Sequence, residues 1–176
     1  GSGDDDNALF KIQGKSLQTA VALDFEAEDT YSIRIKGTDN GGASVEKKFY
    51  IHATDINEPP LPATLSNQTI MENSKAGSTV GRITALDPDD DDEVTLSLAA
   101  DDETLDNESF SLNGTNLVTT TDIDYDTKPK LKVRVTATDT AGLSTDSDLE
   151  IQVLNLSEPP TDITLDNDTV DENAPE

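Results

Sequence analysis

The chain has 176 residues, with 12 basic and 37 acidic side chains and a formal net charge of −25. This charge argues against binding to nucleic acid or to anionic membranes, because both need Lys and Arg on the protein surface. It favours a polyvalent cation or a strongly solvated surface. Cysteine is absent, which excludes disulfides, thiolate metal sites and thiol catalysis. No apolar stretch approaches the roughly 18 residues of a membrane helix.

Apolar and polar residues alternate in five segments along the chain. In order, these segments are residues 31–36, 49–51, 94–98, 131–136 and 149–153. Alternation with period two is typical of half-buried antiparallel strands, and the Gly, Asp, Asn and Pro clusters between the segments favour turns. About seven strands per repeat of roughly 100 residues predict an all-β fold, a Greek-key immunoglobulin-like β-sandwich.

The sequence repeats itself at a spacing of 100 residues, as from Asn7 to Asn107. Other pairs in the same register are Phe10 with Phe110, Gly14 with Gly114, Leu17 with Leu117, Asp24 with Asp124, Asp39 with Asp139, Ile51 with Ile151 and Glu58 with Glu158. Self-similarity at a fixed period indicates tandem copies of one structural unit. The sequence therefore predicts a tandem array of sandwich domains.

The register of the repeat places two domain boundaries. We expect a complete repeat at residues 61–160, the C-terminal part of a truncated repeat at 1–60, and the N-terminal strand of a third repeat at 161–176. A Pro-Pro pair ends each of the segments 55–60 and 155–160, which we name the first and second linkers. Proline fixes φ and suits a short, stiff linker. With only about four strands, residues 1–60 are expected to leave a sheet edge open.

Acidic side chains gather at strand ends and beside the two linkers. Two carboxylates about 5 Å apart repel by roughly 3 kcal/mol at an effective dielectric near 20. Several of them converging at one point therefore need a cation. Calcium accepts about six to eight oxygen ligands in flexible geometry, whereas magnesium needs a stricter octahedron. Zinc would favour His or Cys, and the chain has a single His.

Five short motifs contain many of these acidic residues. They are Leu23-Asp24-Phe25-Glu26, Thr38-Asp39-Asn40-Gly41, Asp55-Ile56-Asn57-Glu58-Pro59-Pro60, Met71-Glu72-Asn73 and Leu86-Asp87-Pro88-Asp89. In this order, these motifs resemble the cadherin repeat, and their compact acidic style resembles the cadherin-like tandem domains of bacterial type. Most of them recur one repeat later. The resemblance covers nearly the whole chain and implies calcium bound between neighbouring repeats.

The resemblance also implies which residues bind the metal. At the first linker they are Asp24, Glu26, Asp55, Asn57, Glu58, Asp87, Asp89 and Asp139. At the second linker they are Glu72, Asp124, Asp126 and Glu158. The second linker departs from the pattern, since Asn155 replaces Asp and Ser157 replaces Asn. We therefore expect the first calcium cluster to be the stronger one and the second to be weak or empty.

Two other interpretations of the acidic residues are less favoured. An EF-hand loop starting at Asp87 would need Gly at its sixth position and Glu at its twelfth, which hold Asp92 and Leu98. The acidic residues after Asp89 are expected to form a solvated turn. Paired carboxylates can hydrolyse glycosides, but here they lie at linkers rather than in a sugar cleft. We expect no catalytic residues and no enzyme.

The leading functional hypothesis is a calcium-binding extracellular module that acts in cell adhesion or as a rigid spacer of a membrane-anchored surface protein. The expected partners are calcium, other repeats of the same chain, and proteins or polysaccharides at a cell surface, with no nucleic acid. The expected location is extracellular, in a bacterium. The alternative is a carbohydrate-binding module of a polysaccharide-degrading or matrix protein, for which Tyr31, Tyr50 and Tyr125 offer few aromatic platforms.

Overall fold

The computed structural model describes residues 5–90, 92–100, 104–160, 163–166, 168 and 172. In this part of the chain the regular elements are strands and two short 3-10 helices, η1 (Asn7–Leu9) and η2 (Asn107–Ser109), so the predicted all-β class is confirmed. The chain divides into two compact units. Residues 1–64, 83–99 and 134–148 form the first unit, and residues 65–82, 100–133 and 149–176 form the second. The domain boundaries near residues 60 and 160 stay a prediction.

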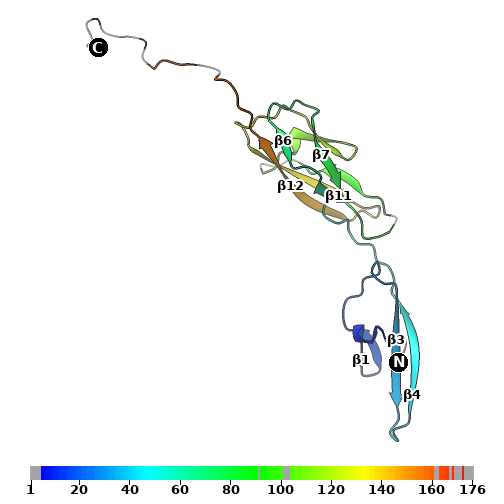
Figure 1. The fold of residues 1–176 in the computed structure, drawn as a ribbon. Helices are drawn as coiled ribbons and strands as arrows, with labels where there is room; N and C mark the ends of the chain where they lie inside the picture. The colour runs from blue at the N-terminus through cyan, green and yellow to red at the C-terminus, as the bar shows by residue number, and fades with distance from the viewer. Residues whose placement is uncertain are drawn as a thin grey trace. The chain divides into compact units, whose positions relative to one another are not determined.

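The first 60 residues contribute two hairpins (Figure 1). Strand β1 (Phe10–Gln13) pairs with β2 (Ser16–Thr19), and β3 (Thr30–Thr38) pairs with β4 (Ser44–His52) over nine residues. The rings of Phe10 and Tyr31 meet edge to face, with their centroids 6.0 Å apart. Among the described residues β4 pairs with no strand besides β3, as expected for an open sheet edge.

The remaining strands form two four-stranded sheets. One sheet has the order β5 (Thr64–Leu65), β7 (Thr79–Thr84), β10 (Asn116–Thr119) and β9 (Phe110–Asn113). The other has the order β6 (Thr69–Met71), β12 (Ser144–Leu154), β11 (Lys130–Thr138) and β8 (Thr95–Leu98). Strand β6 runs parallel to β12, whereas β8 runs antiparallel to β11. Four of the five segments with alternating residues lie wholly in strands, and the fifth, 94–98, begins one residue before β8, which confirms those predictions.

The alternation along β11 and β12 fills the core. Val133, Val135 and Ile151 are fully buried, while the residues that alternate with them are mostly half-buried on β11 and exposed on β12. From the other sheet, Ile83 and Leu117 are also fully buried. Burying a Leu or Ile side chain contributes about 1.5–3 kcal/mol, so these residues supply much of the sandwich's stability.

The 100-residue repeat is also visible in the backbone. Strands β1, β2 and β4 begin 100 residues before β9, β10 and β12. The carboxylate of Asp6 accepts a hydrogen bond from the backbone N–H of Ser32 at 2.6 Å, and Asp106 accepts one from Lys132 at 2.8 Å. The same side chain therefore fastens the same strand in both repeats.

Candidate metal centre

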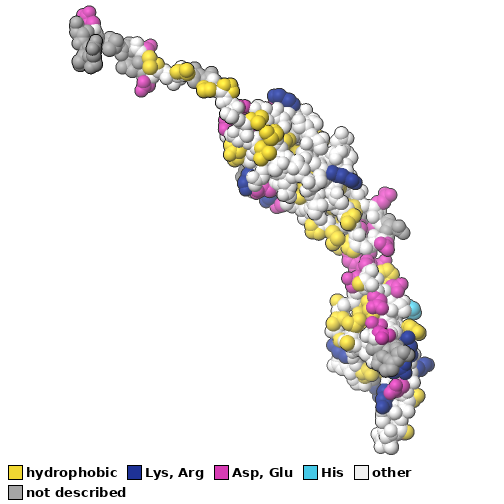
Figure 2. All heavy atoms as spheres, in the orientation of Figure 1, with side chains coloured by type: hydrophobic (Ala, Val, Ile, Leu, Met, Phe, Trp, Pro, Cys, Tyr) yellow, Lys and Arg dark blue, Asp and Glu magenta, His cyan; other side chains and the backbone are white. Residues whose placement is uncertain are grey.

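One group of carboxylates gathers beside the first linker. Glu26, Asp55, Glu58 and Asp89 each offer an oxygen, and these four atoms lie within 4.8 Å of one another. Glu26 lies in the turn before β3, Asp55 and Glu58 follow β4, and Asp89 follows β7. Figure 2 shows acidic side chains crowded along the segment that follows β4. Four negative charges from three separate segments therefore meet at one point.

A second group is formed by Asp87, Asp92 and Asp139, with one oxygen of each again within 4.8 Å of the others. Asp139 is buried, and its Oδ1 accepts the backbone N–H of Leu143 at 2.8 Å in the turn after β11. Asp87 and Asp92 are half-buried. This group therefore lies deeper than the first.

The first linker contacts both groups. The Asn57 amide Nδ2 donates to Asp139 Oδ2 at 2.7 Å, and the Glu58 backbone N–H donates to Asp89 Oδ2 at 2.9 Å. These two bonds hold the linker against the loops that follow β7 and β11.

The pKa values of three carboxyls in the two groups are shifted by their surroundings. Desolvation, and then the negative charges of the surrounding acidic residues, raise the pKa of Glu58 above its usual value; those residues are Glu26, Asp89, Asp55 and Asp24. Desolvation and the charges of Asp89 and Asp92 raise the pKa of Asp87. Desolvation also acts on Asp139, but hydrogen bonds from the Asn57 amide and from backbone N–H groups outweigh it and lower the pKa of that carboxyl. Like charges at short range therefore add to desolvation at Glu58 and Asp87.

Two carboxylate oxygens in this region are buried without a hydrogen-bond partner, Asp87 Oδ2 and Asp89 Oδ1. Within the described residues, no Lys or Arg forms an ion pair with any member of the two groups. An unpaired buried carboxylate oxygen is costly, and a cation would be a suitable partner for these two oxygens. A set of carboxylate oxygens without His or Cys fits calcium.

The structure brings most of the residues expected at the first linker into these groups. The exceptions are Asp24 and Asn57. Asp24 lies outside both groups, and its Oδ1 accepts the backbone N–H of Ala27 at 3.1 Å. Asn57 takes part through its hydrogen bond to Asp139.

Sequence reasoning missed Asp92, which was expected in a solvated turn. The Asp92 backbone N–H instead donates to the Asp89 carbonyl at 3.3 Å, and this turn brings the Asp92 carboxylate back towards Asp87. The signal available in the sequence was the run of acidic residues from 87 to 93.

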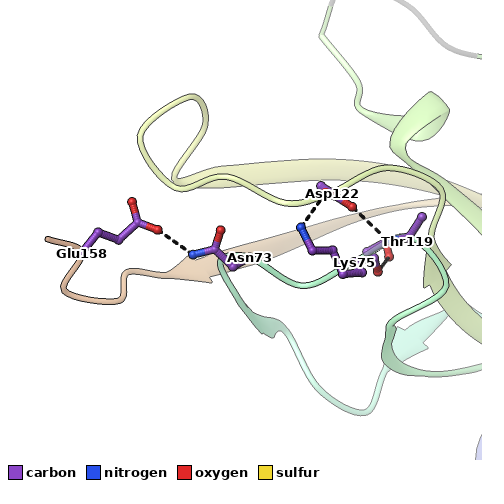
Figure 3. A network of polar contacts seen from close by, with 6 residues as sticks. Asn73, Lys75, Thr119, Asp122 and Glu158 are labelled. Carbon is purple, nitrogen blue, oxygen red and sulfur yellow. Dashed lines mark hydrogen bonds and ion pairs between the residues drawn. The ribbon is translucent and has the colours of Figure 1, made fainter. Parts of the chain in front are cut away.

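The residues expected at the second linker are arranged differently. Within the described part of the chain, Glu72, Asp124, Asp126 and Glu158 belong to no group of three or more potential metal ligands. Glu72 Oε1 accepts the backbone N–H of Leu156, and Glu158 Oε1 accepts the Asn73 amide at 2.6 Å (Figure 3). These two carboxylates meet hydrogen-bond donors rather than one another.

The tyrosines offer little to a sugar ligand. Tyr31 is buried and Tyr125 is half-buried, which leaves Tyr50 as the one exposed tyrosine. The Lys48 ammonium lies 4.5 Å from the centre of the Tyr50 ring. The carbohydrate-binding interpretation stays a prediction.

Comparison with known proteins identifies the class to which this arrangement of sheets and acidic loops belongs. Residues 66–154 match the family described as the Cadherin domain, which is 89 of the 176 residues. The chain therefore belongs to the cadherin family. Its domains are extracellular and are not enzymes, which confirms the prediction that the chain is no enzyme.

Among curated relatives, the chain is similar to Protocadherin gamma-A3 of Homo sapiens, with 31% identity over 108 residues that cover 56% of this chain and 12% of the relative. It is also similar to Protocadherin-16 of Rattus norvegicus, with 36% identity over 109 residues that cover 58% of this chain and 3% of the relative. The chain therefore spans only a small part of these relatives. Both are animal proteins, and they give no support to the bacterial type expected from the sequence.

Solved structures agree with the sandwich fold. PcdhgB3 EC1-4 matches with a TM-score of 0.59 and 28% identity, covering 88% of this chain and 39% of that one. Human Protocadherin-24 EC1-2 matches with a TM-score of 0.57 over 89% of this chain and 80% of that one. Its identity is 21%, so it supports the fold alone. Among the described residues, no helix has both the length and the apolar character needed to cross a membrane.

Proposed function

We propose that this chain is a calcium-binding extracellular module of an adhesion protein, with calcium fixing the first linker against the loops after β7 and β11. The observation that carries the proposal is the pair of buried, unpartnered oxygens, Asp87 Oδ2 and Asp89 Oδ1, inside a crowd of carboxylates. Calcium would supply the positive charge that these oxygens lack. Membership of the cadherin family gives the same interpretation independently.

Two sets of residues would hold the metal. Glu26, Asp55, Glu58 and Asp89 would hold one ion, and Asp87, Asp92 and Asp139 would contribute to a second one at deeper positions. Asn57 orients Asp139 by donating to its Oδ2. Asp24 adds negative charge nearby, as its effect on Glu58 indicates.

The consequence of binding would be mechanical. An ion held jointly by the turn before β3, the linker and the loop after β7 binds only when these segments are together, so it stabilises that arrangement by mass action. The chain would then serve as a stiff spacer or adhesion module within a longer extracellular protein. Other cadherin repeats, and proteins or polysaccharides at a cell surface, are the partners we propose for that protein.

Calorimetric titration with calcium chloride tests this function. We expect heat of binding in the wild-type chain and a loss of at least about tenfold in affinity for Asp89→Asn, equivalent to roughly 1.4 kcal/mol. Asn at position 89 keeps an oxygen for the Glu58 N–H but removes the charge. Glu108→Gln, which changes an exposed acid on η2, is the matched control and should bind like the wild type. The absence of any calcium-dependent heat in the wild type would reject the proposal.

A further inference from the structure

The two linkers occupy equivalent places in the repeat, but their acidic residues have different surroundings. Beside the first linker, carboxylates face carboxylates and two buried oxygens lack partners. Beside the second linker, each of Glu72, Asp124 and Glu158 accepts a hydrogen bond from a protein donor. This difference indicates that different interactions fix each linker in place.

Glu72 fastens the second linker from inside the fold. Its side chain is 4% exposed, and its Oε1 accepts the backbone N–H of Leu156. Its own backbone N–H donates to the Leu154 carbonyl at 3.0 Å. Hydrogen bonds to a carboxylate are stronger than neutral ones, by roughly a factor of two. Glu72 thus forms hydrogen bonds with the chain on both sides of position 155, at Leu154 and at Leu156.

Asn73 adds a second fastening. Its φ is 64°, a left-handed conformation that Asn adopts more readily than most residues. Its backbone N–H donates to the Ile123 carbonyl at 2.8 Å, and its side-chain Nδ2 donates to Glu158 Oε1 at 2.6 Å. Figure 3 shows the Asn73 and Glu158 side chains pointing towards each other. The charge of Glu158 is therefore met by an amide donor.

Asp124 is satisfied as an anion by its own turn. The Thr127 hydroxyl donates to its Oδ2 at 2.6 Å, and the backbone N–H of Asp126 donates to its Oδ1 at 2.9 Å. These donors lower the pKa of Asp124. One repeat earlier, position 27 is Ala, so Asp24 has no hydroxyl at the corresponding place.

The linker sequences reinforce the contrast. Asp55 of the first linker is replaced by Asn155 in the second, which removes a carboxylate. Asn57 is replaced by Ser157, which removes the amide that reaches Asp139 in the first linker. The second linker therefore has fewer potential metal ligands than the first.

We propose that Glu72, Asn73, Leu156 and Glu158 form a metal-free latch that holds the second linker whether or not calcium is present. The chain would then combine a calcium-dependent first linker with a calcium-independent second one. The calcium dependence of the first linker rests on the proposed function. The latch itself rests only on the hydrogen bonds of the second.

Amide hydrogen exchange followed by NMR tests the latch in the intact chain. We expect the Leu156 amide to be protected in EDTA, and its exchange rate to change less than about twofold in millimolar calcium. Free exchange of Leu156 in EDTA, or an exchange rate at least about tenfold slower in calcium, would overturn the latch. In the same spectra, the Glu58 amide reports on the proposed function. If Glu58 ignores calcium while Leu156 stays protected in EDTA, the proposed function fails and the latch stands.

Variants assign this protection to particular side chains. Glu72→Ala should speed Leu156 exchange by about 10- to 100-fold, because a hydrogen bond to a charged group is lost. Glu72→Gln keeps an acceptor oxygen in a side chain of nearly the same shape, so it should retain the fold and show a smaller increase. Equal Leu156 rates in the wild type and in Glu72→Ala would show that Glu72 is not the acceptor.

Asn73→Gly tests the second half of the latch. Glycine adopts positive φ without strain, so the bond from position 73 to the Ile123 carbonyl should survive while the side-chain donor to Glu158 is removed. We expect the Glu158 carboxyl chemical shift to move in this variant, in EDTA as well as in calcium. An unchanged Glu158 signal would contradict the latch.

Discussion

At the scale of single residues, the pKa of Glu58 reflects how closely other carboxylates surround it at the first linker. Its pKa is raised from 4.5 by desolvation and by neighbouring carboxylates. A raised folded-state pKa means that the folded, calcium-free chain is penalised at pH values above it. That penalty is relieved as the pH falls through the folded pKa of Glu58, because protonation removes the repulsion.

We therefore predict that the Glu58 carboxyl titrates above 4.5 in EDTA and shifts downward when calcium is added. The carboxyl carbon chemical shift of Glu58, followed against pH, measures both effects. Glu150 is a matched control in the same chain, because a hydrogen bond from Lys130 lowers its pKa from 4.5. If Glu58 and Glu150 titrated together in EDTA, the crowding inferred for the first linker would be wrong.

At the scale of elements, burial explains why equivalent positions in the two repeats should contribute differently to the free energy of unfolding. Leu117 on β10 is fully buried, whereas Leu17, at the same place on β2, is 37% exposed. We predict that Leu117→Ala costs about 2–5 kcal/mol of unfolding free energy, because it removes buried methyl groups and leaves a cavity. Leu17→Ala should cost less than half as much. Urea unfolding followed by NMR signals from each region measures both costs, and equal costs would contradict this account of the core.

The long strands were predictable from the sequence, and the short ones were not. Alternation is unambiguous over the nine residues of β3 or β11, whereas β5 spans two residues and β6 three, too few for a period to register. Strand β6 pairs in parallel with β12, about 80 residues away, and local patterning does not encode such a pairing. The pairing of β10 with β7 also shifts register between Leu117 and Val118, and local patterning does not encode this irregularity either.

The candidate metal site was also predictable only in part. Motif order predicted which acidic residues lie near the first linker, because those motifs occupy strand ends. It did not predict that Asp92 turns back into the cluster or that Glu72 is taken up by the Leu156 N–H, since both depend on how loops fold over the strands. Sequence spacing specifies the neighbourhood of a carboxylate, whereas the nearest donor decides whether it remains free for a cation.

At the scale of the whole molecule, calcium should raise thermal stability. Free calcium at about 100 times its dissociation constant contributes roughly 2.7 kcal/mol to the state that binds it. For a chain of this size, that corresponds to an increase of about 5–10 °C in melting temperature. Differential scanning calorimetry in EDTA and in calcium measures the change. Asp89→Asn should show a much smaller increase, and an equal one would argue that calcium acts elsewhere.

The two linkers should also differ in their resistance to proteolysis. Ile56 in the first linker is 74% exposed and Leu156 in the second is 41% exposed, at equivalent places in the repeat. In EDTA, repulsion among the carboxylates should loosen the first linker, while the latch keeps the second one closed. We predict that elastase cleaves near Ile56 faster in EDTA than in calcium, whereas cleavage near Leu156 is slow in both. Mass spectrometry of the fragments identifies each cut.

Glu72→Ala should make the second linker cleavable in either condition, because it releases the Leu156 N–H without altering the cluster at the first linker. Equal calcium dependence at the two linkers would show that both are held in the same way.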